Sequence, residues 1–232
     1  MPGRIVVVVG AVGGVGASTV AAMVSSGLAR RGRDVALVDA DPSHGGIEVL
    51  LGSEGQRGAR WPDLSGVRAV IDVADLTGVL PRWRGVEVLS ADRRGGMPLA
   101  AAQAVLESLV GAREHVVIDL PGHHLVSPDP FVAGLVETAS DVVVVTGQDV
   151  LGVCGAVMIR EAAGRRAVLV LRRRRRARVA PAEAAAVLGL RVAALLPSDR
   201  CLGEAVDLGV GPRPGPRYAR SVARLCRGLD SG

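Results

Sequence analysis

The chain has 232 residues, 49% of them hydrophobic but only 2% aromatic, and a formal net charge of +5 in which every basic residue is an arginine. This composition fits a protein with a large aliphatic core, and the moderate charge permits contact with nucleic acid or an anionic membrane without demanding either. Three widely separated cysteines without Cys-x-x-Cys spacing argue against a disulfide framework or a zinc site and favour a reducing cytoplasm.

The N-terminal 29 residues predict a strand, a glycine-rich turn and a helix. An apolar run over 5–9 precedes the segment 10–19 (GAVGGVGAST), and a helical pattern follows over 20–29. Backbone N–H groups and the dipole at such a helix start favour a phosphate there. The uncharged stretch 5–29 also resembles a signal peptide or a membrane span. Because glycines and serines interrupt it, we expect two separate elements in a soluble protein.

The rest of the chain alternates strands and helices. Strands are expected at 34–39, 86–90, 115–119, 141–146, 167–171 and 191–195. Helices are expected at 47–52, 72–80, 98–110, 150–163, 181–188 and 218–229, with a surface loop at 53–66. Short links between alternating elements predict an α/β fold, with a doubly wound, mostly parallel sheet and helices on both faces. No linker or repeat separates a second unit, so residues 1–232 are expected to form a single domain.

Acidic residues follow two of the predicted strands. Asp39 and Asp41 come after the second strand, and Asp119 ends the strand at 115–119. Ligands of parallel sheets bind at the carboxyl ends of the strands. A phosphate beside carboxylates needs a cation, so we expect Mg²⁺ held by Ser18, Asp39 and Asp119, directly or through water. Each acid alone could equally cap a helix or lie in a solvated loop.

Two functional motifs compete for the glycine-rich segment, beside a simple glycine-rich connection. A Walker A loop would place Ser18 at its Ser/Thr position but Ala17 at its lysine position. The pattern Gly-x-x-x-Gly-x-Gly of short-chain dehydrogenases is also satisfied, by Gly10, Gly14 and Gly16. That enzyme class uses a Tyr-x-x-x-Lys pair, whereas this chain has no lysine and its one tyrosine, Tyr218, lies near the C-terminus. We therefore favour nucleotide-phosphate chemistry.

Four segments in the expected order resemble the MinD/ParA ATPases, which have a P-loop NTPase-like fold. Residues 12–19 resemble the deviant Walker A loop, 37–41 the second motif, 116–121 Walker B, and 197–199 the loop that closes over the base. The resemblance implies ATP or ADP as ligand, together with Mg²⁺. The nucleotide-binding residues that it implies are Gly13, Gly14, Val15, Gly16, Ala17, Ser18, Thr19, Pro197 and Asp199.

Alanine at the loop-lysine position is similar to the CpaE/TadZ branch of that family. The segment 58–64 (GARWPDL) looks like actinobacterial members described as septum-site-determining or CpaE-like proteins. The resemblance implies a protein that places a Tad-type pilus secretion apparatus or influences the division site. It also implies a nucleotide-dependent homodimer, secretion ATPases or division proteins as partners, and a location in the cytoplasm or at the inner face of the cell membrane.

The departures from the family pattern limit the expected activity. The two lysine positions hold Val12 and Ala17. Losing a charged hydrogen bond costs about 1.5–3 kcal/mol, or roughly ten- to hundredfold in affinity. Asp41 matches the position that orients the attacking water, so slow hydrolysis remains possible. Because both lysines are missing, we expect a nucleotide-binding switch with weak or absent ATP hydrolysis. Arg172 stands where relatives carry a base-reading Asn, which leaves the base preference open. A DNA-associated partitioning ATPase and a nucleotide-independent scaffold remain as alternatives.

Three surface features have competing interpretations. The arginine run 172–178 could contact DNA, but a solvated loop is favoured, so nucleic acid is not an expected partner. The apolar face of the last helix, 218–229, fits either a membrane surface or a cover over the sheet, and the cover is favoured. His123 and His124 are expected in a switch loop rather than a metal site, while Trp61 and Trp83 anchor either loops or a partner surface.

Overall fold

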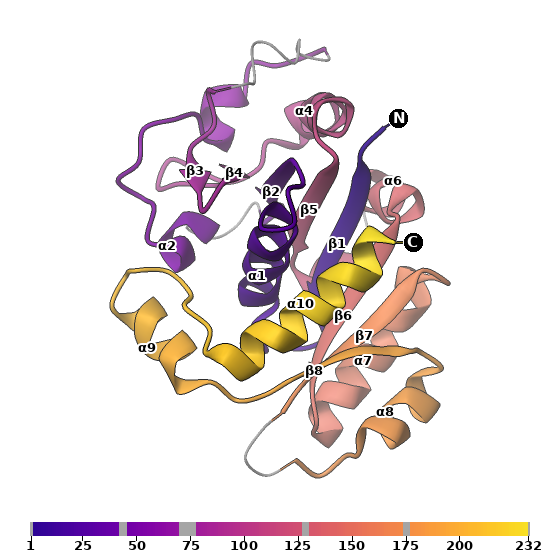
Figure 1. The fold of residues 1–232 in the computed structure, drawn as a ribbon. Coiled ribbons are helices and arrows are strands. Elements are labelled where there is room, and N and C mark those ends of the chain that lie inside the picture. Colours follow the sequence, from indigo (N-terminus) through magenta and orange to yellow (C-terminus); the bar gives the residue numbers. More distant parts are fainter. Residues whose placement is uncertain (1, 42–45, 70–77, 127–129, 174–176, 232) are drawn as a thin grey trace.

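The computed structural model in Figure 1 describes residues 2–41, 46–69, 78–126, 130–173 and 177–231. Its strands are β1 (Arg4–Gly10), β2 (Val35–Asp39), β3 (Arg82–Trp83), β4 (Val86–Leu89), β5 (His115–Leu120), β6 (Asp141–Gly147), β7 (Ala167–Arg172) and β8 (Val192–Leu196). They form one sheet with the order β3-β4-β2-β5-β1-β6-β7-β8. Every neighbouring pair is parallel except β3 and β4, which are antiparallel. The predicted mostly parallel α/β sheet is confirmed.

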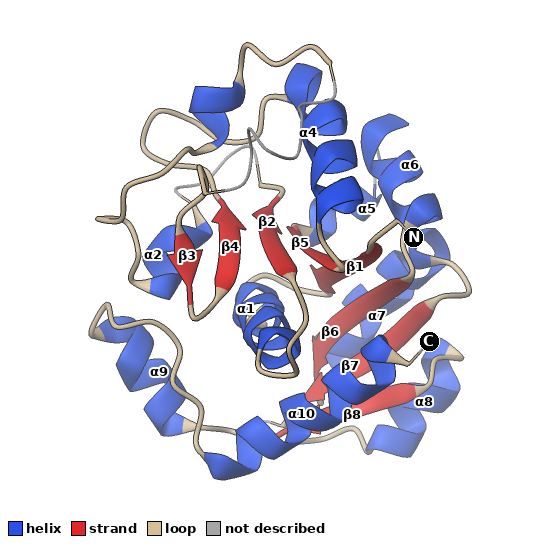
Figure 2. Cartoon of the chain, turned by 45° about the horizontal axis from the view of Figure 1, so that its top comes forward, coloured by secondary structure: helices blue, strands red, loops and turns tan. Residues whose placement is uncertain are grey.

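Helices cover both faces of this sheet, as Figure 2 shows. They are α1 (Ala17–Ala29), α2 (Ile47–Leu51), α4 (Leu99–Ala112), α5 (Gly122–Val126), α6 (Pro130–Thr138), α7 (Val150–Ala163), α8 (Pro181–Leu188), α9 (Arg200–Asp207) and α10 (Pro216–Asp230), with a 3-10 helix, η1 (Trp61–Leu64). The core has two halves, one on each face. One half joins the sheet to α1, α2, α9 and α10, and the other joins it to α4, α5, α6, α7 and α8.

The apolar run at the N-terminus follows from this two-sided burial. In β1, Val6 and Val8 point into the half of the core that contains α1, while Val7 and Val9 point into the other half. All four side chains are fully buried. A central parallel strand reads as a continuous apolar run for this reason, because neither face meets water. Strand β1 and helix α1 are separate elements, as the sequence predicted.

Helix α10 lies across the face of the sheet that also carries α1, and it packs on α1 and β8 (Figure 1). Its apolar residues belong to the core, and all are buried: Tyr218, Val222, Leu225 and Leu229. The expected cover over the sheet is therefore confirmed. Within the part of the chain that the structure describes, the search for a helix long and apolar enough to span a bilayer finds none.

Several elements differ from the sequence-based expectation. The strand β3 and the helices α5, α6 and α9 were not expected. Strand β3 has two residues and α5 has five, too few to show a repeating pattern. The expected surface loop at 53–66 is wrong in part, since it contains η1 and three buried residues, Ser53, Arg60 and Trp61. Most of the helix expected at 72–80, and residues 174–176 of the arginine run, lie outside the described residues.

Candidate functional site

A cavity of about 910 Å³ opens at the carboxyl ends of β1, β2 and β5. Its floor is the glycine-rich segment 10–19, and its walls include Asp39, Asp41 and the segment 119–123. Helix α7 contributes the side chain of Met158, which is largely exposed at the rim. The cavity therefore lies where the topology of a parallel sheet places ligands.

The backbone of the glycine-rich segment is shaped for close approach of a ligand. Gly14 and Gly16 have φ of 70° and 87°, and α1 begins at the next residue, Ala17. No side chain caps this helix start. The first N–H groups of α1 have no partner within the helix, and together with the helix dipole they form an anion site. The expected phosphate cradle is present in geometry.

Arg172, at the end of β7, reaches this cradle from a segment far along the chain. Its Nη1 atom donates a hydrogen bond to the main-chain oxygen of Val15 over 2.9 Å. A Cβ atom at Gly16 would meet that same Nη1 atom, but this atom is the end of a flexible side chain that can move aside, so it is the positive φ that favours glycine there. A guanidinium thus lies beside the start of α1. The family resemblance already implied a position near the nucleotide for Arg172, but not this contact with Val15.

Two buried carboxylates stand side by side next to the loop. Asp39 and Asp119 are paired across the parallel strands β2 and β5, and each is at most 9% exposed. Burial raises the pKa of Asp119 to about 7, while a hydrogen bond from the Ser18 hydroxyl opposes this rise and the neighbouring Asp39 adds to it. Burial also raises the pKa of Asp39 to about 6. Ionising either carboxyl in this buried place costs free energy, and a bound cation would offset that cost.

These oxygens fit a magnesium ion. The Asp39 carboxylate already accepts N–H groups from Asp41 and Ile47, at 3.1 and 2.8 Å, so it would meet the ion through water. Ser18 and Asp119 would offer their oxygens more directly. Among the described residues no cluster of three or more His, Cys, Asp or Glu side chains suits a metal. An ion here would thus take most ligands from phosphate and water, as Mg²⁺ prefers.

Three aspartates line the cavity, and the described lining includes no arginine. Val12 and Ala17, which stand at the two lysine positions, both contribute to that lining. The described lining therefore offers a phosphate neutral backbone N–H groups and the oxygens that could hold a cation, while the charge of Arg172 lies beside the cradle and outside that lining. The lining lacks the lysine charge that stabilises phosphoryl transfer.

The raised pKa values predict how the metal-free protein responds to pH. The Asp119 carboxyl has a pKa of about 7 in the folded protein, against the usual 3.8. Its contribution to the stability of the fold is therefore fully present below about pH 4, where the carboxyl is protonated in both the folded and the unfolded state. That contribution is lost as the pH rises to about 7, because the folded state must then release a proton that it binds more tightly than the unfolded chain. In EDTA, the free energy of unfolding is expected to fall more steeply from about pH 5 to pH 8 in the wild type than in Asp119→Asn.

Urea denaturation across that range measures the difference. Asp63, Asp92, Glu114 and Asp230 have lowered pKa values and titrate below the range. His115, whose pKa burial lowers, contributes equally to both proteins and cancels. Added Mg²⁺ is expected to flatten the wild-type curve. Identical pH dependence in the two proteins would show that Asp119 carries no raised pKa.

The structure brings most of the predicted site residues together. Those lining the cavity are Gly13, Gly14, Val15, Gly16, Ala17, Ser18, Thr19, Asp39, Asp41 and Asp119. Pro197 and Asp199 lie outside it. Asp199 instead caps α9, accepting from Leu202 N at 3.3 Å, and also accepts from Gly215 N at 2.6 Å. Its predicted contact with the base stays a prediction.

The two adjacent histidines lie in helix α5 and not in a loop. His123 lines the cavity, and the rings of His123 and His124 stack with centroids 4.2 Å apart. Their helix follows Walker B directly, between Leu120 and the cavity rim. The prediction of a loop is therefore wrong, because both residues lie in a helix, and a contact of this segment with a partner or the nucleotide stays a prediction.

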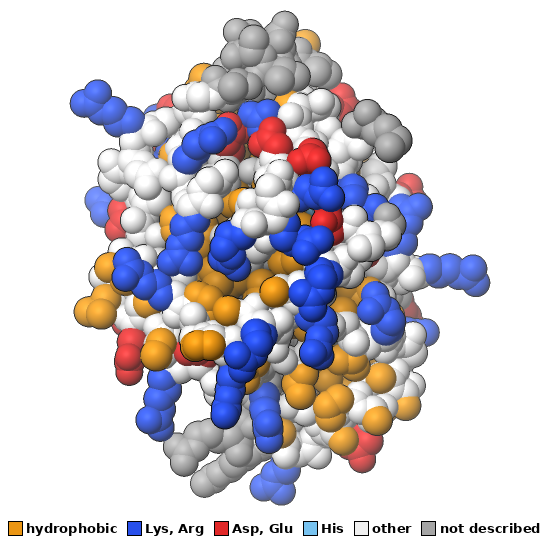
Figure 3. All heavy atoms as spheres, viewed as in Figure 1, with side chains coloured by type: hydrophobic (Ala, Val, Ile, Leu, Met, Phe, Trp, Pro, Cys, Tyr) orange, Lys and Arg blue, Asp and Glu red, His pale blue; other side chains and the backbone are white. Residues whose placement is uncertain are grey.

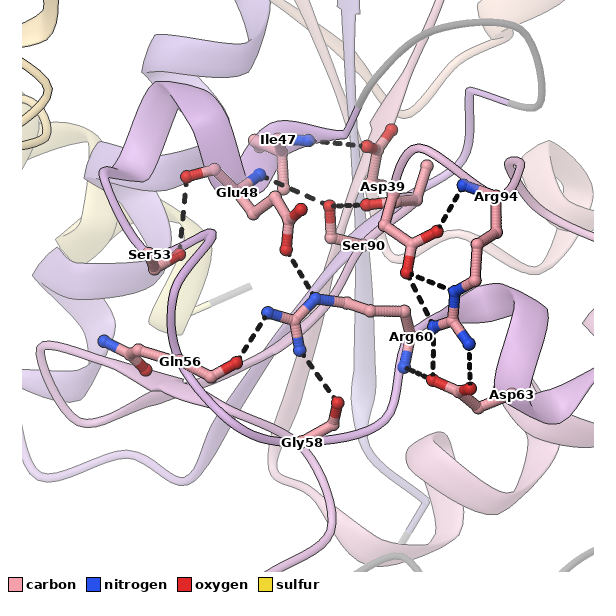
Figure 4. A network of polar contacts seen from close by, with 12 residues as sticks. Asp39, Ile47, Glu48, Ser53, Gln56, Gly58, Arg60, Asp63, Ser90 and Arg94 are labelled. Atoms are coloured by element: carbon pink, nitrogen blue, oxygen red, sulfur yellow. Dashed lines mark hydrogen bonds and ion pairs between the residues drawn. The ribbon is translucent and has the colours of Figure 1, made fainter.

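Behind Asp39 lies a polar network that the sequence did not indicate (Figure 4). The buried Arg60 donates to the Glu48 carboxylate, and to the main-chain oxygens of Gln56 and Gly58 at 3.2 and 3.1 Å. Trp61, fully buried, donates its Nε1–H to the main-chain oxygen of Asp39 over 2.7 Å. The segment around η1 thus holds the end of β2 in place. Trp61 anchors a loop, which was one of its two expected roles.

Comparison with known proteins agrees with this geometry. Residues 2–73 match the ParA family model, described as NUBPL iron-transfer P-loop NTPase. The uncharacterized protein Rv3660c of Mycobacterium tuberculosis is 40% identical over 120 residues, which are 51% of this chain and 33% of that protein. The matched region thus spans about a third of the curated relative.

Solved structures extend the likeness over the whole chain. A ParA family ATPase from Chlorobium tepidum superposes with a TM-score of 0.81 at 15% identity, covering 97% of this chain and 98% of that one. The septum site-determining protein MinD from Pyrococcus horikoshii, solved with Mg-ADP, gives 0.76 at 22% identity, covering 98% and 96%. The chain therefore has the P-loop NTPase fold of ParA and MinD, and its N-terminal third carries the ParA sequence pattern.

Proposed function

We propose that the chain binds ATP or ADP with Mg²⁺ and hydrolyses ATP weakly or not at all, acting as a positional switch. One observation supports this proposal most directly. A single cavity is lined by the backbone cradle at the start of α1 and by two buried carboxylates, with alanine at the position of the lysine. Its fold is shared with MinD solved with Mg-ADP, which supports nucleotide binding. Asp41, at the cavity wall, would orient water in any residual hydrolysis.

The finer role that we propose follows the CpaE/TadZ-like and septum-site-determining proteins. The switch would place a Tad-type pilus secretion apparatus or the division site, working as a single domain near the inner face of the cell membrane. Exposed apolar side chains near the cavity mouth, Val126 and Met158, support a partner surface there, such as a second copy in a nucleotide-dependent dimer. Neither side chain has a role in the core of an isolated chain.

The two alternatives receive less support. A nucleotide-independent scaffold would not need a glycine with positive φ at position 16 or two buried carboxylates beside the loop. A DNA-partitioning ATPase would need efficient turnover, and the cavity lacks the lysine that assists it. Nucleotide binding without fast hydrolysis fits both observations.

Calorimetry with Mg-ADP tests the proposal, and the variant Arg172→Ala tests which side chain assists binding. The wild type is expected to bind saturably, and Arg172→Ala to bind about tenfold or more weakly, because a charged hydrogen-bond donor beside the cradle is lost. Arg173→Ala removes the same charge from the next, exposed residue and is expected to bind within about twofold of the wild type.

Three other results have distinct meanings. No saturable binding by the wild type at millimolar nucleotide would overturn the proposed function. Unchanged affinity in Arg172→Ala would show that the guanidinium does not assist the phosphates. Tighter binding in that variant would show that Arg172 covers the cradle, since its contact with Val15 would then have to break before a nucleotide enters.

A further inference from the structure

A second depression, of about 510 Å³, lies on the face that carries α10, away from the glycine-rich loop. Four arginines from four separate segments line it, together with small or apolar residues. The arginines are Arg30 after α1, Arg84 between β3 and β4, Arg213 before α10, and Arg220 within α10. Figure 3 shows arginine side chains gathered on this face. The depression shares no lining residue with the nucleotide cavity.

Acidic partners do not balance these arginines. Within the described part of the chain, Arg84, Arg213 and Arg220 form no ion pair. Arg30 donates one long hydrogen bond, 3.4 Å, to the Ser26 hydroxyl. The pKa of Arg84 is lowered by burial and by the positive charges of Arg213 and Arg30. Like charges that lie close together without a counter-charge repel one another, so this arrangement by itself does not stabilise the folded chain.

Other arginines of the same surface are paired. Arg31 and Arg33 both contact Asp230 at 2.8 Å, and Arg94 contacts Asp63 and Asp92. Another arginine-lined depression includes two acids, Asp141 and Glu161, among its lining residues. The described lining of the four-arginine depression, by contrast, includes no acid.

The backbone holds Arg84 in a costly conformation at this place. Arg84 has φ of 50°, the one positive φ outside glycine in the described chain. Arg84 and Gly85 form the two-residue turn between the antiparallel strands β3 and β4, and both have the positive φ that such a hairpin turn requires. Its guanidinium lies over the Trp83 ring, 4.8 Å from the ring centre, which fixes the direction of the side chain. The contact with Trp83 therefore holds the guanidinium of Arg84 in one place.

We propose that the four-arginine depression binds a compact polyanion that carries several phosphate groups, either free in solution or as a lipid headgroup. Guanidinium groups match phosphate oxygens in pairs, and four of them around a concave surface suit clustered phosphates. Duplex DNA presents phosphates along an extended line, which fits a ridge better than a depression of this size. The site is independent of the nucleotide cavity.

The test uses tripolyphosphate in EDTA at a pH above the raised pKa values of Asp39 and Asp119, a condition in which the three ionised aspartates of the nucleotide cavity repel the probe. Calorimetry is expected to show saturable binding that is weakened at least tenfold in Arg213→Gln/Arg220→Gln, whose side chains are exposed and make no hydrogen bond or ion pair among the described residues. Arg84→Gln gives a second, independent loss. The control Arg165→Gln/Arg191→Gln removes the same charge from the other depression and is expected to bind as the wild type does.

Vesicles distinguish the two sources of phosphate. Co-sedimentation with vesicles containing a phosphorylated inositol lipid, lost in Arg213→Gln/Arg220→Gln and competed by tripolyphosphate, would assign a headgroup. Binding of tripolyphosphate without co-sedimentation would assign a free ligand. The proposal is overturned if the wild type does not bind tripolyphosphate, if the control pair weakens binding as much as the pocket pair, or if a short DNA duplex binds more tightly than either probe through the same arginines.

Discussion

Replacing Ala17 by lysine is expected to tighten Mg-ATP binding by about ten- to hundredfold, and to raise the hydrolysis rate by about a hundredfold or more. Ala17 is the first residue of α1 and lines the cavity, beside Ser18 and the paired carboxylates. A lysine there would add a positive charge to a cavity whose described lining has three aspartates and no arginine. The rate should gain more than the affinity, because charge on the transferred phosphoryl group is greatest in the transition state.

Phosphate release under single turnover and calorimetry with ADP measure the two effects. Ala17→Gln is the matched control, since glutamine adds length and a hydrogen-bond donor without charge. A lysine variant no faster than the glutamine variant would show that the missing charge does not limit this site. In that case some other part of the cavity, such as the position of Asp41, would have to explain slow turnover.

Replacing Arg60 by methionine is expected to lower the free energy of unfolding by about 3–5 kcal/mol. The side chains of Arg60 and Glu48 form a buried ion pair, exposed by only 6% and 10%. Removing the guanidinium leaves the Glu48 carboxylate buried without its charged partner. Two main-chain oxygens, of Gln56 and Gly58, lose a donor as well (Figure 4). Urea denaturation at neutral pH measures the loss.

Two controls separate burial from charge. Arg94→Met breaks ion pairs at a side chain that is 56% exposed, and is expected to lower the free energy of unfolding much less than Arg60→Met does. Glu48→Gln combined with Arg60→Met removes both charges and is expected to recover a substantial part of the loss. Equal costs for Arg60→Met and Arg94→Met would show that the Arg60 pair is not buried in solution.

The parts of the site that could be predicted are those encoded locally. The run 5–9 identifies a strand buried on both faces, and the glycines that follow it identify a tight turn into a helix. Asp39 and Asp119 could be placed together because parallel strands end at one edge of the sheet, and β2 and β5 are indeed neighbours. In each case a short segment of sequence shows both which element forms and where its functional residue lies in the sheet.

The parts that could not be predicted depend on contacts between distant segments. Arg172 lies 157 residues from Val15 in sequence, and only the order of the strands brings β7 near the start of α1. The Arg60 and Glu48 pair lies in a segment poor in apolar residues, which resembles a solvated loop until its burial is seen. The four-arginine depression likewise draws on residues from 30 to 220 that share no local motif.

Asp39 is joined to the segment after it by three hydrogen bonds, two at its carboxylate and one at its main-chain oxygen. The carboxylate accepts from the N–H groups of Asp41 and Ile47, and the main-chain oxygen accepts from Trp61 Nε1 at 2.7 Å. Because the side chain of Asp39 also lines the cavity, a ligand that shifts it is expected to shift α2 and η1 as well. By reciprocity, a partner that binds α2 or η1 and moves Asp39 is expected to change the affinity for that ligand by the same factor.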